Sequence, residues 1–236
     1  MPVTFDRAVV VIPAHDEADK LPQCLKAIVT AAACLDIPVL TVVVLDACTD
    51  GSAALAGRFG ADVHFVEVDA KNVGAARAAG FTYARRVLDD DDSRVWYATT
   101  DADSRVDPDW LVRQMAADVD MVLGVVRITN WQNLSAASVR RYLAAYRAKS
   151  ERRGGGHGHV HGANMGFRAD SYWAIGGFAA LASREDVDLV RRFERDGRRI
   201  HRDPELSVET SARREGRAPK GFANYLRGVA RRGDVA

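Results

Sequence analysis

The chain has 236 residues, of which 47% are apolar and 28% are charged, a composition typical of a globular protein with a sizeable core. Its 33 Lys and Arg residues nearly balance its 32 Asp and Glu residues, so the strong basic excess of a nucleic-acid-binding protein is missing. Cys24, Cys34 and Cys48 are too few and too scattered for a disulfide framework or a zinc site. Residues 1–7 hold no basic segment followed by an apolar stretch, and we expect a cytoplasmic protein.

The N-terminal part of the chain alternates between two hydrophobic periods. Short β-branched runs predict buried strands, and the segments between them, with apolar residues at helical spacing, predict helices. In chain order we expect a strand at 9–12 ended by Pro13, a helix at 19–34, a strand at 39–45, a helix at 49–59, a strand at 63–66, a helix at 74–88 and a strand at 95–99. This order predicts an α/β domain with a mainly parallel sheet flanked by helices.

The pattern becomes less regular after residue 104. We expect helices at 109–117, 135–152 and 186–196, a strand at 120–126, and a basic helix at 223–232. No internal repeat or linker divides the chain, so residues 1–236 are expected to form a single domain.

Two carboxylates, Asp101 and Asp103, directly follow the buried strand expected at 95–99. Ligands of open α/β sheets bind at the carboxyl ends of parallel strands. Carboxylate oxygens suit Mg²⁺ and Mn²⁺, and two of them leave coordination positions open for a diphosphate. The Asp-x-Asp pair therefore predicts a metal-assisted diphosphate site at this edge of the sheet.

Polar residues also follow the other expected strands. Residues 13–17 follow the first strand, and residues 46–52 follow the second. Asn72 opens the third helix, where Gly74 permits close approach to a ligand and Arg77 suits a phosphate. Each cluster alone also fits an ordinary helix start, because Asp, Asn, Glu and Thr favour that position. Their shared place on one rim of the sheet favours a binding site.

Six segments, in order, resemble those of the family 2 glycosyltransferases. They are VIPAHDE at 11–17, VVLDACTDGS at 43–52, NVGAARAAG at 72–80, TDADS at 100–104 with PDWL at 108–111, GANMGFR at 162–168 with GGF at 176–178, and EDVDL at 185–189 with GRRI at 197–200. The resemblance spans residues 9–203, and Leu45 stands where the family commonly has a first Asp. Six ordered segments are far more specific than any one of them.

The resemblance implies the GT-A fold, a Rossmann-like, mainly parallel sheet flanked by helices. It implies a metal-dependent, inverting hexosyltransferase that moves one sugar from a nucleotide-sugar, with a nucleotide-sugar-binding half at about 1–104 and an acceptor-side half at about 105–236. The donor is expected to be a UDP- or GDP-sugar, the cofactor Mg²⁺ or Mn²⁺, and the acceptor a small molecule, a glycan or a lipid-linked hydroxyl. The QxxRW signature of processive synthases is absent from the sequence, which favours single addition.

Family positions imply roles for individual residues. Asp186 would be the catalytic base, although Glu185 and Asp186 alone also fit a helix N-terminus. Asp103 would be the metal ligand on the diphosphate, with Asp101 holding the ribose or assisting the metal. The implied nucleotide-binding residues are Pro13, Ala14, His15, Glu17, Asp46, Asn72, Arg77 and Asp101. The candidates for acceptor or lid contacts are His161, Asn164 and Glu185.

Two further segments allow several interpretations. The Gly-rich residues 153–162 carry His157, His159 and His161, and they predict a loop that orders over a ligand, a metal site or an inert surface loop. His161 and His201 are candidates for a further metal ligand. The basic residues 211–227 predict a lid over the diphosphate, contact with an anionic membrane surface, or a solvated face.

Other functions stay open on the sequence alone. A phosphotransferase of the haloacid dehalogenase type would have Thr or Val where Arg105 stands. A nucleotidyltransferase would have a Gly-rich basic loop, whereas residues 13–17 contain no Gly. A catalytically silent sugar-nucleotide-binding or scaffold protein is the third alternative, and donor hydrolysis would separate it from an enzyme.

Overall fold

The computed structural model describes residues 4–89, 91–129, 131, 135–150 and 156–210. One eight-stranded sheet runs through these residues, in the order β3-β2-β1-β4-β7-β6-β8-β5. The strands are β1 (Arg7–Ala14), β2 (Val39–Asp46), β3 (Val63–Val68), β4 (Val95–Thr99), β5 (Ser104–Arg105), β6 (Met121–Arg127), β7 (Met165–Arg168) and β8 (Ile200–Thr210).

The sheet is parallel in its first half and mixed in its second. Strands β3, β2, β1 and β4 pair in parallel. Strand β7 is antiparallel to both β4 and β6, while β8 pairs in parallel with β6 and antiparallel with β5. The expected parallel sheet is therefore confirmed up to β4, and the second half of the sheet adds the antiparallel pairs.

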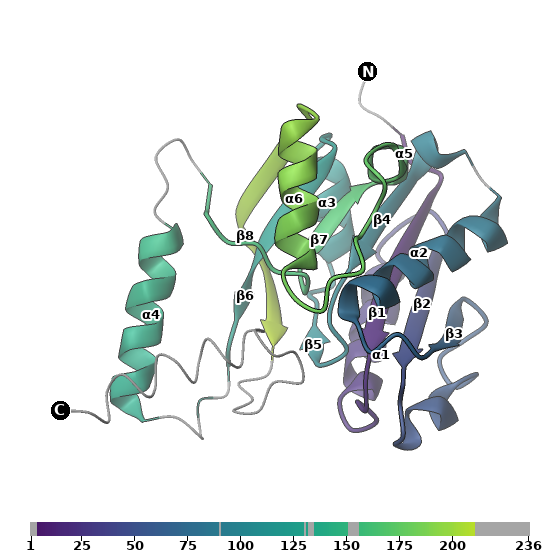
Figure 1. Ribbon diagram of the computed structural model, residues 1–236, viewed down its shortest axis with the longest axis horizontal. Helices are drawn as coiled ribbons and strands as arrows, with labels where there is room; N and C mark the ends of the chain where they lie inside the picture. The colour runs from purple at the N-terminus through teal and green to yellow at the C-terminus, as the bar shows by residue number, and fades with distance from the viewer. Residues whose placement is uncertain (1–3, 90, 130, 132–134, 151–155, 211–236) are drawn as a thin grey trace.

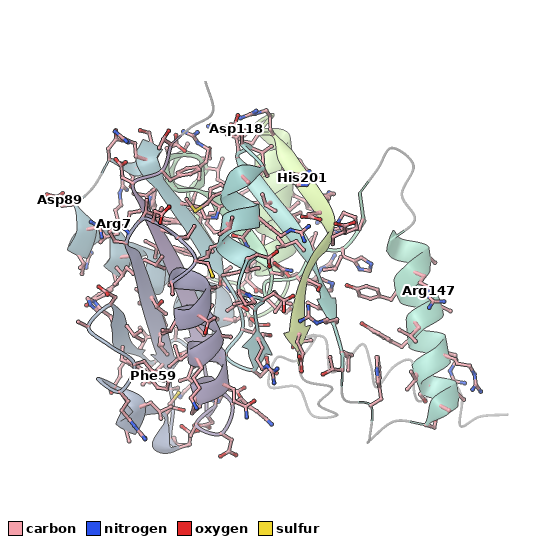
Figure 2. The ribbon with its side chains drawn as sticks, turned by 180° about the vertical axis from the view of Figure 1, so that it is seen from behind. Arg7, Phe59, Asp89, Asp118, Arg147 and His201 are labelled. Atoms are coloured by element: carbon pink, nitrogen blue, oxygen red, sulfur yellow. The ribbon has the colours of Figure 1, made fainter. Side chains whose placement is uncertain are left out.

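Helices cover both faces of the sheet. They are α1 (Leu21–Ala32), α2 (Val73–Leu88), α3 (Trp110–Ala116), α4 (Ala136–Ser150), α5 (Ala169–Ala174) and α6 (Glu185–Arg195), with short 3-10 helices η1 (Gly51–Leu55) and η2 (Asp92–Arg94). Helices α2, α5 and α6 lie on the face turned to the viewer in Figure 1, and α1 and α3 lie on the face shown in Figure 2. Helix α4 lies apart from these layers, to the side of β6 (Figure 1).

Alternate residues of β1 belong to two separate cores. Val10 and Ile12 pack with α1, while Val9 and Val11 pack with α2. All four are fully buried, as expected for a strand covered on both faces. The continuous β-branched run therefore anchors both helical layers to one central strand, whose carboxyl end opens into the candidate site.

Strand β1 continues past Pro13, where the sequence predicted its end. The hydroxyl of Thr99 donates to the carbonyl of Val11 at 2.8 Å, so this carbonyl faces β4. Pro13, two residues later, faces the same side, but the pairing with β4 ends at Val11. Because no partner strand remains there, the missing N–H of proline leaves no bond unmade.

The helix predicted at 49–59 is wrong, because only the 3-10 helix η1 forms there. Asp50 accepts hydrogen bonds from the N–H groups of Ser52 and Ala18, at 2.9 and 2.8 Å, which ties the segment to the loop after β1. Gly57 and Gly60 then adopt left-handed φ angles of 76° and 103°. These turns end the segment before an α-helix can propagate.

The other predicted elements within the described residues are confirmed, with small shifts at their ends. The basic helix predicted at 223–232 lies outside the described residues. Within the part of the chain that the structure describes, no helix is both long enough and apolar enough to cross a bilayer.

Candidate active site

The loops after β1 and β2 are joined by hydrogen bonds. Asp16, at a left-handed φ of 53°, accepts from the N–H of Thr49 at 2.6 Å, and this bond holds the pKa of Asp16 below its usual value. The Cys48 thiol accepts from the N–H of Asp16 at 3.3 Å. Asp16, Cys48 and Asp50 are the one close group of three potential metal ligands among the described residues. Both carboxylates accept backbone N–H groups. We therefore interpret the group as one that holds the two loops together.

Asp46 fixes the loop that leads into α2. Its side chain is nearly buried, and its oxygens accept from the N–H groups of Ala70, Lys71 and Asn72, at 2.7, 2.8 and 2.8 Å. Asn72 in turn accepts from the N–H of Ala75 at 3.0 Å and caps α2. Two residues expected to bind the nucleotide thus shape the backbone of one wall of the site.

Four more of the expected nucleotide-binding residues, Pro13, Ala14, His15 and Glu17, lie at the end of β1 and in the loop that follows it. Ala14 is buried, Pro13 and Glu17 are partly buried, and His15 is exposed. His15 Nδ1 lies 2.6 Å from the carbonyl oxygen of Asp46, which links the ends of β1 and β2. This segment therefore lies on the same rim as the loops described above.

The Asp-x-Asp turn follows β4 directly and lies above α1. Ala102, between the two carboxylates, is buried in the core shared with α1. The buried Cys24 thiol of α1 donates to the carbonyl of Asp101 at 3.5 Å. Burial raises the pKa of this thiol strongly, and the charges of Asp103, Asp101 and Glu17 raise it further. The Asp-x-Asp turn therefore packs against α1.

Asp101 and Asp103 differ in their surroundings. Oδ1 of Asp101 accepts from Nη2 of Arg77 at 2.6 Å, while 42% of the Asp101 side chain stays exposed. Desolvation raises the pKa of Asp101 to about 6, opposed by Arg77 and assisted by neighbouring carboxylates, of which Asp103 acts most strongly. Asp103 is partly exposed. The turn thus presents two carboxylates of which one is anchored to a buried cation.

Arg77 lies behind the rim and not on it. Its side chain is only 2% exposed, and it donates to Thr99 Oγ1 at 3.2 Å, to Asp101 and to Glu185. Burial lowers the pKa of the guanidinium, but the carboxylates of Asp101, Glu185 and Asp186 outweigh it and raise the pKa above its usual value. Arg77 is therefore a fully charged group that is already paired with protein carboxylates.

The three acidic residues at the start of α6 lie in three different environments. Glu185 is 5% exposed, and burial raises its pKa although Arg77 opposes the shift. Asp188 forms an ion pair with Arg192 at 2.8 Å, one helical turn away. Asp186 is partly exposed, and its Oδ2 accepts from the N–H of Gly162 at 3.0 Å. Asp186 is the one of the three that is both partly exposed and outside every ion pair formed among the described residues.

Asn164 is fully buried, and its side-chain amide is bonded within the protein. Its Oδ1 accepts from Trp110 Nε1–H at 2.9 Å, and its Nδ2 donates to the carbonyls of Val125 and Leu206, both at 2.8 Å. These bonds join α3, β6 and β8. His161 is partly buried and immediately precedes Gly162, so it lies beside the loop that contacts Asp186.

The two preceding histidines are packed into the protein. His157 Nδ1 accepts from the N–H of His159, and its Nε2 lies 3.0 Å from the Leu123 carbonyl, so both ring nitrogens are used. The His159 ring stacks on Tyr146 with centroids 3.9 Å apart. This geometry opposes a metal site at the three histidines, and residues 153–155 lie outside the described residues. His201, on the exposed start of β8, is three strands away from β4 (Figure 2).

Sequence reasoning missed Thr99 and Cys24 as parts of this site. Thr99 supports Arg77 from the end of β4, and Cys24 lies beneath the Asp-x-Asp turn. Thr99 immediately precedes the TDADS segment, and this position is the sequence feature that could have identified it as a site residue. Cys24 lies on the apolar face of α1 and carries no sequence signal apart from that position.

The glycosyl transferase family 2 model matches residues 9–176, and no curated protein matches the sequence. Among solved structures, the chain is similar to S. aureus TarS 1–349 in complex with UDP-GlcNAc, with a TM-score of 0.64 and 13% identity, over 94% of this chain and 65% of that one. It is also similar to the mannosyltransferase PcManGT from Pyrobaculum calidifontis in complex with GDP-Man and Mn²⁺, with a TM-score of 0.63 and 21% identity, over 97% of this chain and 70% of that one.

These structural likenesses confirm the expected fold, a curled mixed sheet of the GT-A type flanked by helices. The chain spans about 65% of the length of the TarS chain. The family match covers more than half of the 236 residues and includes the loops after β1, β2 and β4. On this match, the chain belongs to glycosyl transferase family 2.

Proposed function

We propose that the protein is a metal-dependent, inverting glycosyltransferase that moves one sugar from a UDP- or GDP-sugar to a hydroxyl acceptor. Family membership supports glycosyl transfer. The similar structures were obtained with UDP-GlcNAc in TarS and with GDP-Man and Mn²⁺ in PcManGT, which supports a nucleotide-sugar donor and a divalent cation here.

The charge of the site is the observation that carries this proposal. Arg77 donates to Asp101 at 2.6 Å and to Glu185, and the charges of Asp103, Glu185 and Asp186 raise the pKa of Asp101, so these five side chains form one charged group. A diphosphate adds further negative charge to a group that already has three more negative than positive charges when all are ionised. Because like charges repel strongly in a partly desolvated site, donor binding there needs an additional cation.

The residues present suit such a cation. Mg²⁺ is commonly bound by one or two carboxylates together with substrate phosphates, and Mn²⁺ accepts the same oxygen ligands. Asp101 and Asp103 supply two carboxylates from one turn, and Oδ1 of Asp101 is already oriented by Arg77. When bound, the cation neutralises the charge that develops on the diphosphate leaving group.

Asp186 is the proposed catalytic base. Inverting transfer needs a carboxylate that takes the acceptor proton on the face of the sugar opposite the diphosphate. The Asp186 carboxylate is oriented by the N–H groups of Gly162 and Val187, at 3.0 and 2.7 Å. It is partly exposed and comes from a different element than the Asp-x-Asp turn. The proposed base and the Asp-x-Asp turn thus come from two different elements that meet at Arg77.

The donor panel for a direct test is UDP-GlcNAc, UDP-glucose, GDP-mannose, dTDP-glucose and ADP-glucose, each with and without Mn²⁺. A donor that binds the native state raises the melting temperature. We expect one UDP- or GDP-sugar to do so only with Mn²⁺, and we expect the protein to release the nucleoside diphosphate from it. NMR of the fresh product should show the opposite anomeric configuration.

Asp103→Ala tests how much of the donor affinity depends on the metal. We expect calorimetry to show loss of the Mn²⁺-dependent part of donor affinity, with the far-UV circular dichroism of the wild type. Asp109→Ala removes an exposed carboxylate that makes no capping bond to α3 and serves as the matched control. Unchanged Mn²⁺-dependent affinity in Asp103→Ala would remove Asp103 as the metal ligand.

A further inference from the structure

The guanidinium of Arg77 joins two walls of the site. From α2, it donates to Asp101 and Thr99 at the end of β4 and to Glu185 at the start of α6. The Asp101 contact is 2.6 Å long and the Thr99 contact 3.2 Å. These partners lie 22 to 108 residues away in sequence, so the arrangement exists only in the folded chain.

A buried guanidinium needs all of these partners. Removing a charge from water is costly unless hydrogen bonds and opposite charges compensate for it. Nε, Nη1 and Nη2 of Arg77 each have a protein acceptor, and its Cζ lies 5.6 Å from the centre of the Phe178 ring. With 2% of its surface exposed, Arg77 is poorly placed to contact a phosphate.

Gly162 connects this cation to the proposed base. A Cβ built on Gly162 would lie 2.6 Å from Nη2 of Arg77, so the loop backbone passes directly against the guanidinium. The N–H of the same residue donates to Oδ2 of Asp186. A shift of Arg77 would therefore move both the carboxylate of Glu185 and the backbone group that orients Asp186.

We infer that Arg77 is a positioning residue that sets the donor-side carboxylate Asp101 and the acceptor-side pair Glu185–Asp186 at a fixed separation, and that Glu185 serves to hold Arg77. This inference rests on the proposed function of the site. Glu185 is buried against Arg77 and does not take the acceptor proton, while Asp186 remains available for that step. Neither Arg77 nor Glu185 contacts the substrate.

The test combines Arg77→Lys, Glu185→Gln and the double variant. Lysine keeps the charge but cannot donate to three separate acceptors in fixed directions. We expect each single variant to lower kcat for nucleotide release on the order of 10- to 100-fold, as a small misplacement of catalytic groups does. Both substitutions break the same contact between Arg77 and Glu185. The kcat of the double variant should therefore lie within about threefold of the kcat of the less active single variant.

Binding of UDP and GDP in the presence of Mn²⁺ distinguishes positioning from direct phosphate contact. We expect Arg77→Lys and Arg77→Met to leave the Kd of the better-binding nucleotide within about threefold of wild type. Arg77→Met leaves two carboxylates without their partner and lowers stability, so Arg77→Lys is the variant on which the kinetic result depends. Arg85→Lys, on the same helix but in an exposed pair with Asp92, is the matched control and should keep the wild-type kcat.

The outcomes separate this inference from the proposed function. A wild-type chain that releases no nucleotide from any donor contradicts the proposed function and the inference together. If the wild type is active and the kcat losses of Arg77→Lys and Glu185→Gln multiply in the double variant, the inference is overturned and the proposed function stands. A rise of tenfold or more in the Kd measured with Mn²⁺, with kcat unchanged, would make Arg77 a phosphate ligand and overturn the inference as well.

Discussion

Gly162 donates its backbone N–H to Oδ2 of Asp186 at 3.0 Å, across 24 positions of the chain. The loop before β7 thereby orients a carboxylate that belongs to the first turn of α6. A backbone donor cannot rotate away as a side chain can, so the Asp186 carboxylate has a defined direction before any substrate binds. Such preorganisation is what a general base requires.

Gly162→Ala tests how closely this loop must approach Arg77. The added methyl group would lie 2.6 Å from Nη2, so the loop or the guanidinium must shift. We expect kcat to fall on the order of 10- to 100-fold through misplacement of Asp186, with a lower melting temperature. Gly51→Ala is the control for stability, because its nearest neighbour would be 3.9 Å away. Wild-type kcat in Gly162→Ala would show that the close approach is not needed.

Asp186→Asn tests the proposed base. The amide nearly preserves the shape of the carboxylate but cannot take a proton, so turnover should fall roughly 10²- to 10⁴-fold while nucleotide affinity changes little. Single-turnover measurements should include Glu185→Gln and Asp188→Asn. Asp188 is paired with Arg192, and we expect its variant to stay close to wild type. Near-normal transfer by Asp186→Asn beside an inactive neighbour would assign the base to that neighbour.

Asp46→Asn tests the role of one buried carboxylate in shaping the loop before α2. The carboxylate accepts three backbone N–H groups. Asparagine keeps only one side-chain oxygen, and its NH₂ group would face a backbone N–H that has lost its acceptor. We expect a loss of about 1–3 kcal/mol in the free energy of unfolding and faster amide exchange at residues 70–72. Asp69→Asn, in an exposed pair with Lys71, should change neither quantity.

His157 predicts a pH dependence of stability. Burial lowers the pKa of His157 from its ordinary value of 6.5, so the unfolded chain takes up a proton at a higher pH than the folded chain. The free energy of unfolding should therefore fall as the pH falls through about 6.5, with a slope of at most about 1.4 kcal/mol per pH unit from this group.

Urea denaturation between pH 7.5 and 5 measures this effect. His157→Gln keeps one donor and one acceptor but removes the titration, and we expect a flatter pH dependence than in wild type. His201→Gln, at an exposed position on β8 (Figure 2), controls for the loss of a histidine. An unchanged slope in His157→Gln would assign the pH dependence to other groups.

The fold was largely predictable from local patterns. Buried strands such as β2, which is buried along its whole length, are encoded as continuous β-branched runs, and α2 is encoded by helical spacing after a capping Asn72. These signals are local because they depend on burial of neighbouring residues. The helix prediction for 49–59 was wrong because this segment forms hydrogen bonds with residues 17 and 18 of another loop. The local hydrophobic period does not show such long-range contacts.

The sequence alone was enough to identify the residues of the candidate site. Which of them are exposed and which are buried supports was decided by the tertiary structure. Asp101, Glu185 and Asp186 are recognisable from their motifs, and strand order alone brings the ends of β1, β2 and β4 to one rim. The sequence suggested Arg77 for a phosphate and Asn164 for a ligand, yet both are buried and fully bonded within the protein. A side chain's exposure and its charged partners depend on which distant segments pack around it, and those contacts exist only in the folded chain.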